Sequence, residues 1–271
     1  NKNTKYTGND DQNPEKLSLA YTSVENEVKL RAEKIANISN FRITAGVGVE
    51  FPKYENDTYQ KIFLITPVTI NYQTSFSLTK YNLFASANYT TPDDKLSLTL
   101  GFRSDANNYS NSMKNLLGTF SPRLAVSYKV LNNLSFSSSV GRYYQLPPLT
   151  VLGYADNSGG LINKNVDYIG VDHYIAGVEY KKASLLQVTF EVFYKKYSNM
   201  LRSVNDNIPL MGKSPVYGAS GNEPAASDIK GKSYGAELSV RLFAGDRFNL
   251  SGTGTLYRSL YQQGETKKWI P

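Results

Sequence analysis

Residues 231–243 read Gly-Lys-Ser-Tyr-Gly-Ala-Glu-Leu-Ser-Val-Arg-Leu-Phe, and residues 248–258 read Phe-Asn-Leu-Ser-Gly-Thr-Gly-Thr-Leu-Tyr-Arg. In the first segment every second side chain from Tyr234 to Leu242 is apolar, and glycine, glutamate, serine and arginine fill the positions between. Successive side chains of a strand point to opposite faces, so the two segments predict a hairpin around the polar turn Ala-Gly-Asp-Arg. One face carries charges, hydroxyls and glycines and never becomes a second core. Such a hairpin is typical of the wall of a transmembrane β-barrel rather than of a soluble sandwich.

The same unit recurs along the chain and predicts five hairpins, or about ten strands. The other four hairpins pair 27–36 with 41–51, 75–90 with 95–105, 120–130 with 134–144, and 171–181 with 185–197. Segment 27–36 also suits a helix, and its neighbours decide for a strand. The connections between hairpins are long and polar, and they span 52–74, 106–119, 145–170 and 198–231. Short turns at one rim and long loops at the other predict an all-β, antiparallel up-and-down barrel with its long loops outside the cell.

The composition agrees with a sheet that has one apolar face. Only 40% of the 271 residues are hydrophobic, yet 21 are tyrosines. A tyrosine at a membrane interface keeps one side of its ring apolar and the other wet, so aromatic residues near strand ends predict two girdles. A tyrosine-rich soluble β protein would have a similar composition. No apolar run approaches the roughly 20 residues of a membrane helix, so any crossing must use strands.

The net charge of +7 comes from lysines and arginines scattered over turns, loops and the polar face. No basic run is interleaved with aromatic residues, so nucleic-acid binding is not indicated. A mildly basic surface suits the anionic lipopolysaccharide of an outer membrane instead. The chain has no cysteine, which agrees with an oxidising compartment. It starts at Asn1 without a signal peptide, so we expect either a mature chain or a piece of a longer one.

The sequence contains no set of residues that predicts an enzyme. His173 is the only histidine, and a Ser-His-Asp set would have to use it. Its place in the alternation puts it on the polar face at a strand start, where a hydrogen bond at the rim or in the lumen is the simpler interpretation. Residues 156–160 offer oxygens but lack the acidic residue that completes a calcium loop. No metal and no cofactor are predicted.

Binding is therefore the remaining function. The segment Arg-Tyr-Tyr-Gln-Leu-Pro-Pro ends a strand and opens a long loop, and it contains Tyr143, Tyr144 and Gln145. Aromatic rings with a basic and an amide group at a rim could hold a sugar, a siderophore or a peptide. A girdle followed by a proline stop is the plainer interpretation. With Arg103 and Arg123 on the polar face, these residues are the predicted ligand or lumen contacts.

Several stretches together resemble the barrel of TonB-dependent outer-membrane receptors of the Bacteroidetes type. They are 94–103 (DKLSLTLGFR), 119–128 (TFSPRLAVSY), 140–148 (VGRYYQLPP), 173–180 (HYIAGVEY), 190–199 (FEVFYKKYSN) and 230–238 (KGKSYGAEL). Each stretch alone is weak, and their order and spacing from about residue 75 to 258 carry the resemblance.

The resemblance implies a barrel of about 22 strands around an N-terminal plug. It also implies uptake of a scarce nutrient, such as a siderophore or an oligosaccharide, powered through TonB, ExbB and ExbD. This sequence departs from that pattern, because it has about ten strands, no plug and no TonB box. We therefore expect residues 1–271 to be a single β-barrel region in the bacterial outer membrane, with the plug and last strands absent. The expected partners are lipid and lipopolysaccharide, a small nutrient ligand, and the TonB-ExbB-ExbD complex through the missing plug.

Two alternatives stay open. About ten strands could close alone into a small passive porin. A soluble β-rich carbohydrate-binding module would need a second sheet to cover its charged face. An outer-membrane enzyme is disfavoured by the single histidine.

Overall fold

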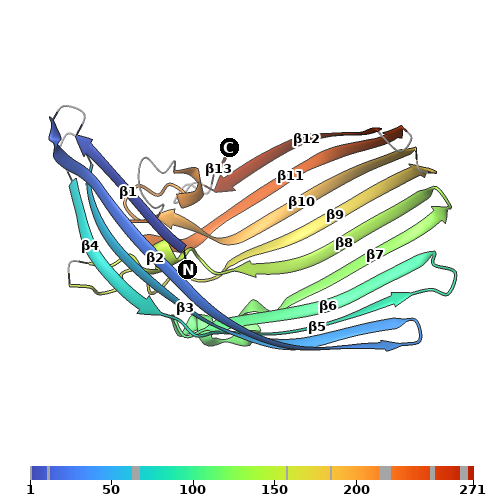
Figure 1. Cartoon of the computed structure of the whole chain (residues 1–271), viewed down its shortest axis with the longest axis horizontal. Helices are drawn as coiled ribbons and strands as arrows, with labels where there is room; N and C mark the ends of the chain where they lie inside the picture. The colour runs from blue at the N-terminus through green and yellow to red at the C-terminus, as the bar shows by residue number, and fades with distance from the viewer. Residues whose placement is uncertain are drawn as a thin grey trace.

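The computed structural model describes residues 2–10, 13–62, 68–156, 158–183, 185–213, 221–244, 248–262 and 268–271. These residues form one antiparallel sheet of 13 strands, which Figure 1 shows side by side in a curved wall. The strand order follows the sequence, except that β4 lies off the path and pairs with β3. Among the described residues, no helix has the length and apolar character needed to cross a membrane.

The strands are β1 (Lys2–Asp10), β2 (Asn13–Ile38), β3 (Phe41–Ile62), β4 (Val68–Ser77), β5 (Lys80–Thr90), β6 (Leu96–Asn107), β7 (Ser121–Leu131), β8 (Leu134–Gln145), β9 (Ile169–Lys182), β10 (Leu186–Ser203), β11 (Ala225–Ala244), β12 (Phe248–Gln262) and β13 (Trp269–Ile270). The helical turns are η1 (Ser112–Lys114), η2 (Leu116–Thr119), α1 (Leu149–Leu152) and η3 (Leu210–Gly212). The five predicted hairpins are confirmed as β2/β3, β5/β6, β7/β8, β9/β10 and β11/β12. Most of the turn that opened the sequence analysis, residues 245–247, lies outside the described residues.

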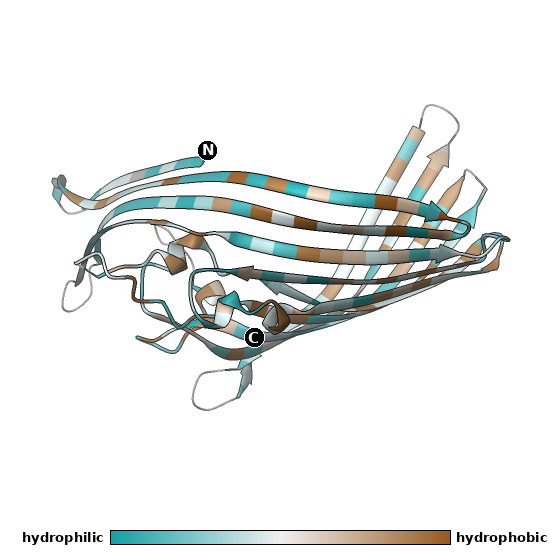
Figure 2. Cartoon of the chain, turned by 90° about the horizontal axis from the view of Figure 1, so that it is seen from below, coloured by the Kyte–Doolittle hydropathy of each residue, from teal (hydrophilic) through white to brown (hydrophobic). Residues whose placement is uncertain are grey.

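The apolar face of this sheet is open, and the polar face is partly covered. Val28, Leu100 and Leu256 on the apolar face are 61%, 61% and 82% exposed. A protein dissolved in water would bury such a row, whereas lipid covers the outside of a transmembrane barrel. Figure 2 shows hydrophobic and hydrophilic positions alternating along the long strands.

The prediction of a loop over residues 52–74 is wrong, because β3 continues to Ile62 and β4 begins at Val68. β4 and β5 continue one register along β3, since Lys53 pairs with Ser77 and Glu50 with Lys80. The break between them lies opposite Pro52. The Leu78 N–H donates to the Pro52 carbonyl over 2.9 Å, and proline has no N–H to return the bond. Above the membrane, β3 therefore keeps its antiparallel pairing, first with β5 and then with β4. We call the interruption opposite Pro52 the crease.

The connections at the long-loop rim pack against one another. Their apolar cluster contains Leu78, Tyr109, Met113, Val151, Leu152, Val166, Tyr168, Leu201 and Leu210. Asn163 is 2% exposed, donates to the carbonyls of Val151 and Glu223, and accepts from the Ala225 N–H. One side chain therefore ties together three chain segments. The loops form a small packed layer rather than independent turns.

Candidate ligand site on the polar face

A group of aromatic and basic side chains lies on the polar face just below the packed loops. Arg123 of β7, Gly141 of β8 and His173 of β9 are register partners across three neighbouring strands. Tyr143 follows Gly141 by two residues and so shares its face. The Arg123 guanidinium carbon lies 4.3 Å from the centre of the Tyr143 ring. The ring centres of Tyr143 and His173 are 4.8 Å apart and the rings are tilted by 41°. The three side chains thus form one contiguous group, which we call the stack.

The missing side chain of Gly141 gives this stack room. A Cβ at that position would lie 3.1 Å from the Tyr143 Oη and 3.2 Å from the Arg123 Cγ. Tyr143 can therefore lean across β8 between its two partners. The Arg123 Nε is buried and has no hydrogen-bond partner in the structure. A buried donor without a partner costs free energy.

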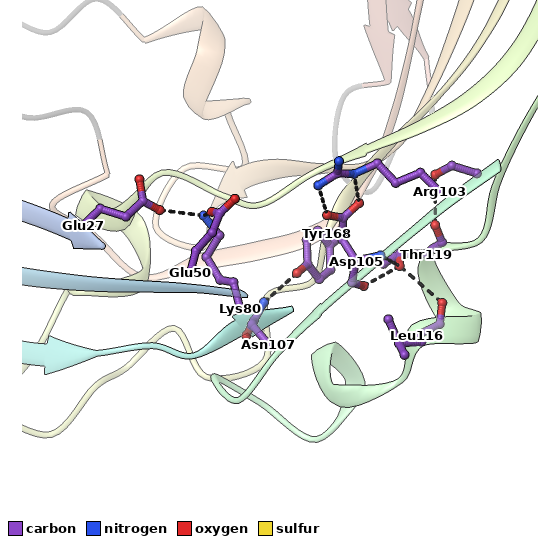
Figure 3. A network of polar contacts seen from close by, with 10 residues as sticks. Glu27, Glu50, Lys80, Arg103, Asp105, Asn107, Leu116, Thr119 and Tyr168 are labelled. Atoms are coloured by element: carbon purple, nitrogen blue, oxygen red, sulfur yellow. Dashed lines mark hydrogen bonds and ion pairs between the residues drawn. The ribbon is translucent and has the colours of Figure 1, made fainter. Parts of the chain in front are cut away.

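Arg103 lies on the neighbouring strand β6, two residues beyond the Arg123 partner Gly101, and its side chain has different contacts. Its guanidinium forms two hydrogen bonds to the Asp105 carboxylate, of 2.6 and 2.8 Å. The Asp105 N–H donates to the Thr119 hydroxyl over 2.8 Å, and that hydroxyl donates to the Asp105 carbonyl. Figure 3 shows this chain of contacts running from β6 to the helical turn η2. Arg103 is thus paired within its own strand, and the backbone of Asp105 holds the loop beside the site.

Tyr143, Tyr144 and Gln145 are not brought together. Consecutive strand residues point to opposite faces, and Tyr144 packs against the apolar loop cluster. Gln145 shares the face of Tyr143, is exposed, and pairs with Ile169. The structure thus brings together Arg123 and Tyr143 from the predicted set. It adds His173, which contacts a ring where the sequence suggested a hydrogen bond.

A second polar group lines the same face higher up, above the membrane. Asn56 donates to the hydroxyls of Tyr54 and Tyr72, over 2.9 and 3.3 Å, and Tyr72 donates to Asn222 over 2.9 Å. Burial raises the pKa of both phenols well above the ordinary tyrosine value, so they are neutral at physiological pH. Gly153 lies against the rings of Tyr54 and Phe76, which shows that a loop covers the polar face here.

The stack has no arrangement for bond-breaking chemistry. A cation over an aromatic ring binds and orients a ligand rather than activating a nucleophile. Among the described residues, no group of three His, Cys, Asp or Glu side chains could hold a metal. Asp156 accepts hydrogen bonds from the backbone N–H groups of Ser158 and Gly160, so its carboxylate closes its own turn.

A curved antiparallel wall with an apolar outer face and a polar inner face defines a class, the outer-membrane β-barrels. A family model described as "TonB dependent receptor-like, beta-barrel" matches residues 1–270. The chain belongs to this family, whose members are outer-membrane receptors and transporters rather than enzymes. Membership confirms the resemblance, and the outer-membrane location of the family decides against the soluble module.

Solved structures show the same fold. The outer membrane transporter YddB from Escherichia coli matches with a TM-score of 0.57 and 14% identity, over 90% of this chain and 34% of that one. The siderophore receptor PirA from Pseudomonas aeruginosa gives 0.61 and 16%, over 90% and 44%. The ferripyoverdine receptor of the outer membrane of Pseudomonas aeruginosa, bound to ferripyoverdine, gives 0.60 and 13%, over 93% and 34%. This chain thus spans less than half of each, and at such identities the likeness concerns the fold alone. A search of curated protein sequences gave no match.

Proposed function

We propose that this chain forms part of the barrel of a receptor that imports a scarce nutrient, such as a siderophore or an oligosaccharide, across the outer membrane. The observation that carries the proposal is the stack of Arg123, Tyr143 and His173 on the polar face. Uptake is powered through TonB, ExbB and ExbD, which act on a plug domain outside residues 1–271. Those residues then serve as a single barrel region, and the nutrient contacts the face that the plug leaves free.

The stack favours a cargo with an anionic oxygen beside a flat or apolar group. The Arg123 guanidinium suits a carboxylate or phenolate oxygen, because hydrogen bonds between charged partners are stronger than neutral ones. The Tyr143 ring offers an apolar surface next to that cation. Lys195 pairs with His173 in the next strand and adds positive charge to the same face. Gln145, exposed on that face, provides an amide for a polar group of the cargo.

The test uses the full-length receptor in outer membranes and two probes, a set of ferric siderophores and a set of neutral and acidic oligosaccharides. Tyr143→Ala is expected to weaken the binding of the accepted probe about tenfold, because it removes a stacking partner and its cation contact. Tyr128→Ala, on the apolar face, is the matched control and leaves binding unchanged. Equal affinities for both variants would show that the stack is not the site. Uptake that continues without TonB would refute the coupling.

A further inference from the structure

Basic side chains gather on the outside of the wall, on the face opposite to the stack. Across β8 to β11, Arg142 pairs with Asp172, Asp172 with Lys196, and Lys196 with Lys232. The pleat gives all four the apolar outer face of the sheet. We name Arg142, Lys196 and Lys232 the basic arc.

The basic arc lies directly above a row of aromatic rings. Tyr174, Tyr194 and Tyr234 lie two positions from Asp172, Lys196 and Lys232 on their strands and are 48%, 40% and 39% exposed. Their ring centres are 6.2 and 6.5 Å apart. Exposed tyrosines in a row on the outer face mark the level where hydrocarbon meets headgroups. The arc therefore lies at headgroup height on the side of the long loops.

The arc carries more positive charge than its acidic neighbour offsets. The Asp172 carboxylate forms an ion pair with the Arg142 guanidinium, with hydrogen bonds of 2.6 and 3.0 Å. Within the described part of the chain, no ion pair holds Lys196 or Lys232. The Lys232 Nζ lies 4.3 Å above the Trp269 ring, and that ring is 41% exposed on the same face. Arg258 pairs with Tyr234 in the row below and adds a further outward cation.

The rest of the described wall is not basic at this height. On β3 the outward Lys53 pairs with Glu55 over 2.6 Å, and Asp57 follows on the same face. On β6 and just before β7, the outer positions next to Phe102 are Ser104 and Phe120, which carry no charge. The excess of outward cations at this height is thus found on β8 to β12, in the basic arc and Arg258. A general need for solubility would spread such charge around the whole rim.

We infer that the basic arc is a binding site for the phosphate groups of lipopolysaccharide. An outer-membrane barrel with its long loops outside places the arc at the outer leaflet, where lipopolysaccharide presents phosphates at the top of its hydrocarbon. Lys196 and Lys232 contact the phosphates, since lysines near an anionic membrane surface attract its charges. Trp269 and the tyrosine row pack against the sugar and acyl boundary below. The inference rests on the orientation in the proposed function.

The experiment measures lipopolysaccharide bound to the full-length receptor purified in detergent, with intact lipopolysaccharide and the same lipid after removal of its phosphates as probes. Lys196→Gln with Lys232→Gln is expected to lower the affinity for intact lipopolysaccharide about thirtyfold, and phosphate removal to abolish the difference. The matched control removes the same charge from outward positions near the short turns, by Lys34→Gln with Lys182→Gln. The heat-modifiable mobility of the barrel on a gel shows that each variant is folded.

Equal affinities for the arc and control variants would overturn the inference. Undiminished binding of the phosphate-free lipid would also overturn it. So would an arc variant that loses a bound protein but still binds lipopolysaccharide. Cargo binding separates this inference from the proposed function, because the arc and Tyr143 lie on opposite faces. The arc variant is expected to bind cargo normally, and Tyr143→Ala is expected to bind lipopolysaccharide normally.

Discussion

Replacement of Leu124 by arginine tests which face of the wall meets lipid. Leu124 lies four residues from both Tyr128 and Phe120, which mark the two ends of the apolar band on this strand. It is 41% exposed and pairs with Leu100 and Val140, so the position is central in the band and surrounded by apolar side chains.

An arginine at the midplane of a barrel's lipid face costs about 2–4 kcal/mol. That cost corresponds to a roughly 30- to 700-fold loss in the folding equilibrium. Ala125→Arg is the matched control, because Ala125 is the next residue and points to the other face. There it lines a hollow of about 240 Å³ with Ser97 and Glu191, which offers room and a carboxylate. We expect Ala125→Arg to change stability by less than about 1 kcal/mol.

The assay is urea unfolding of the full-length receptor in lipid vesicles, followed by heat-modified gel mobility. Leu124→Arg should shift the midpoint to lower urea while Ala125→Arg stays near the parent. If both arginines destabilise equally, or if Ala125→Arg is the worse, the assignment of the apolar face to lipid is wrong.

Two further predictions concern the packed loops. Asn163→Ala removes three hydrogen bonds and leaves buried backbone groups unpaired, at roughly 1–3 kcal/mol, so the loops should be cleaved faster by protease in intact membranes; exposed Asn111→Ala should not change the cleavage rate. Burial raises the pKa of Tyr168 to about 12, whereas an unfolded tyrosine ionises near pH 10. Its contribution to stability is therefore complete below pH 10 and lost as the pH rises from about 10 to 12; protease resistance should fall in that window, and Tyr168→Phe should flatten the fall. A loop layer equally resistant at pH 9 and pH 12 would contradict the burial of this phenol.

The membrane part of the wall could be predicted because two solvents act on it. Lipid on one side and water on the other impose a period of two, which marks strands such as β6 and β11 clearly. Above the membrane both faces meet water or loops. Lys53, Glu55 and Asp57 alternate there with polar or tyrosine side chains, so the pattern vanishes and the strand resembles a loop.

The candidate site could be predicted only in part. The polar face of Arg123 and the rim position of Tyr143 follow from the alternation. The same rule already separates Tyr144 from Tyr143, since neighbours on a strand face apart. The contact with His173 depends on the register of three strands, and the space for it depends on Gly141. Neither can be derived from the sequence of one strand.

The crease opposite Pro52 has a mechanical consequence. A sheet bends most easily where hydrogen bonds between its strands are missing. One such bond is absent here, because proline has no N–H to donate. Below the crease, the strands are surrounded by lipid. Above it, they are held by the packed loops through the hydrogen bond from Tyr72 to Asn222. A load applied to the loops from outside the cell would therefore be taken up as flexure along this line, and the embedded half would stay still.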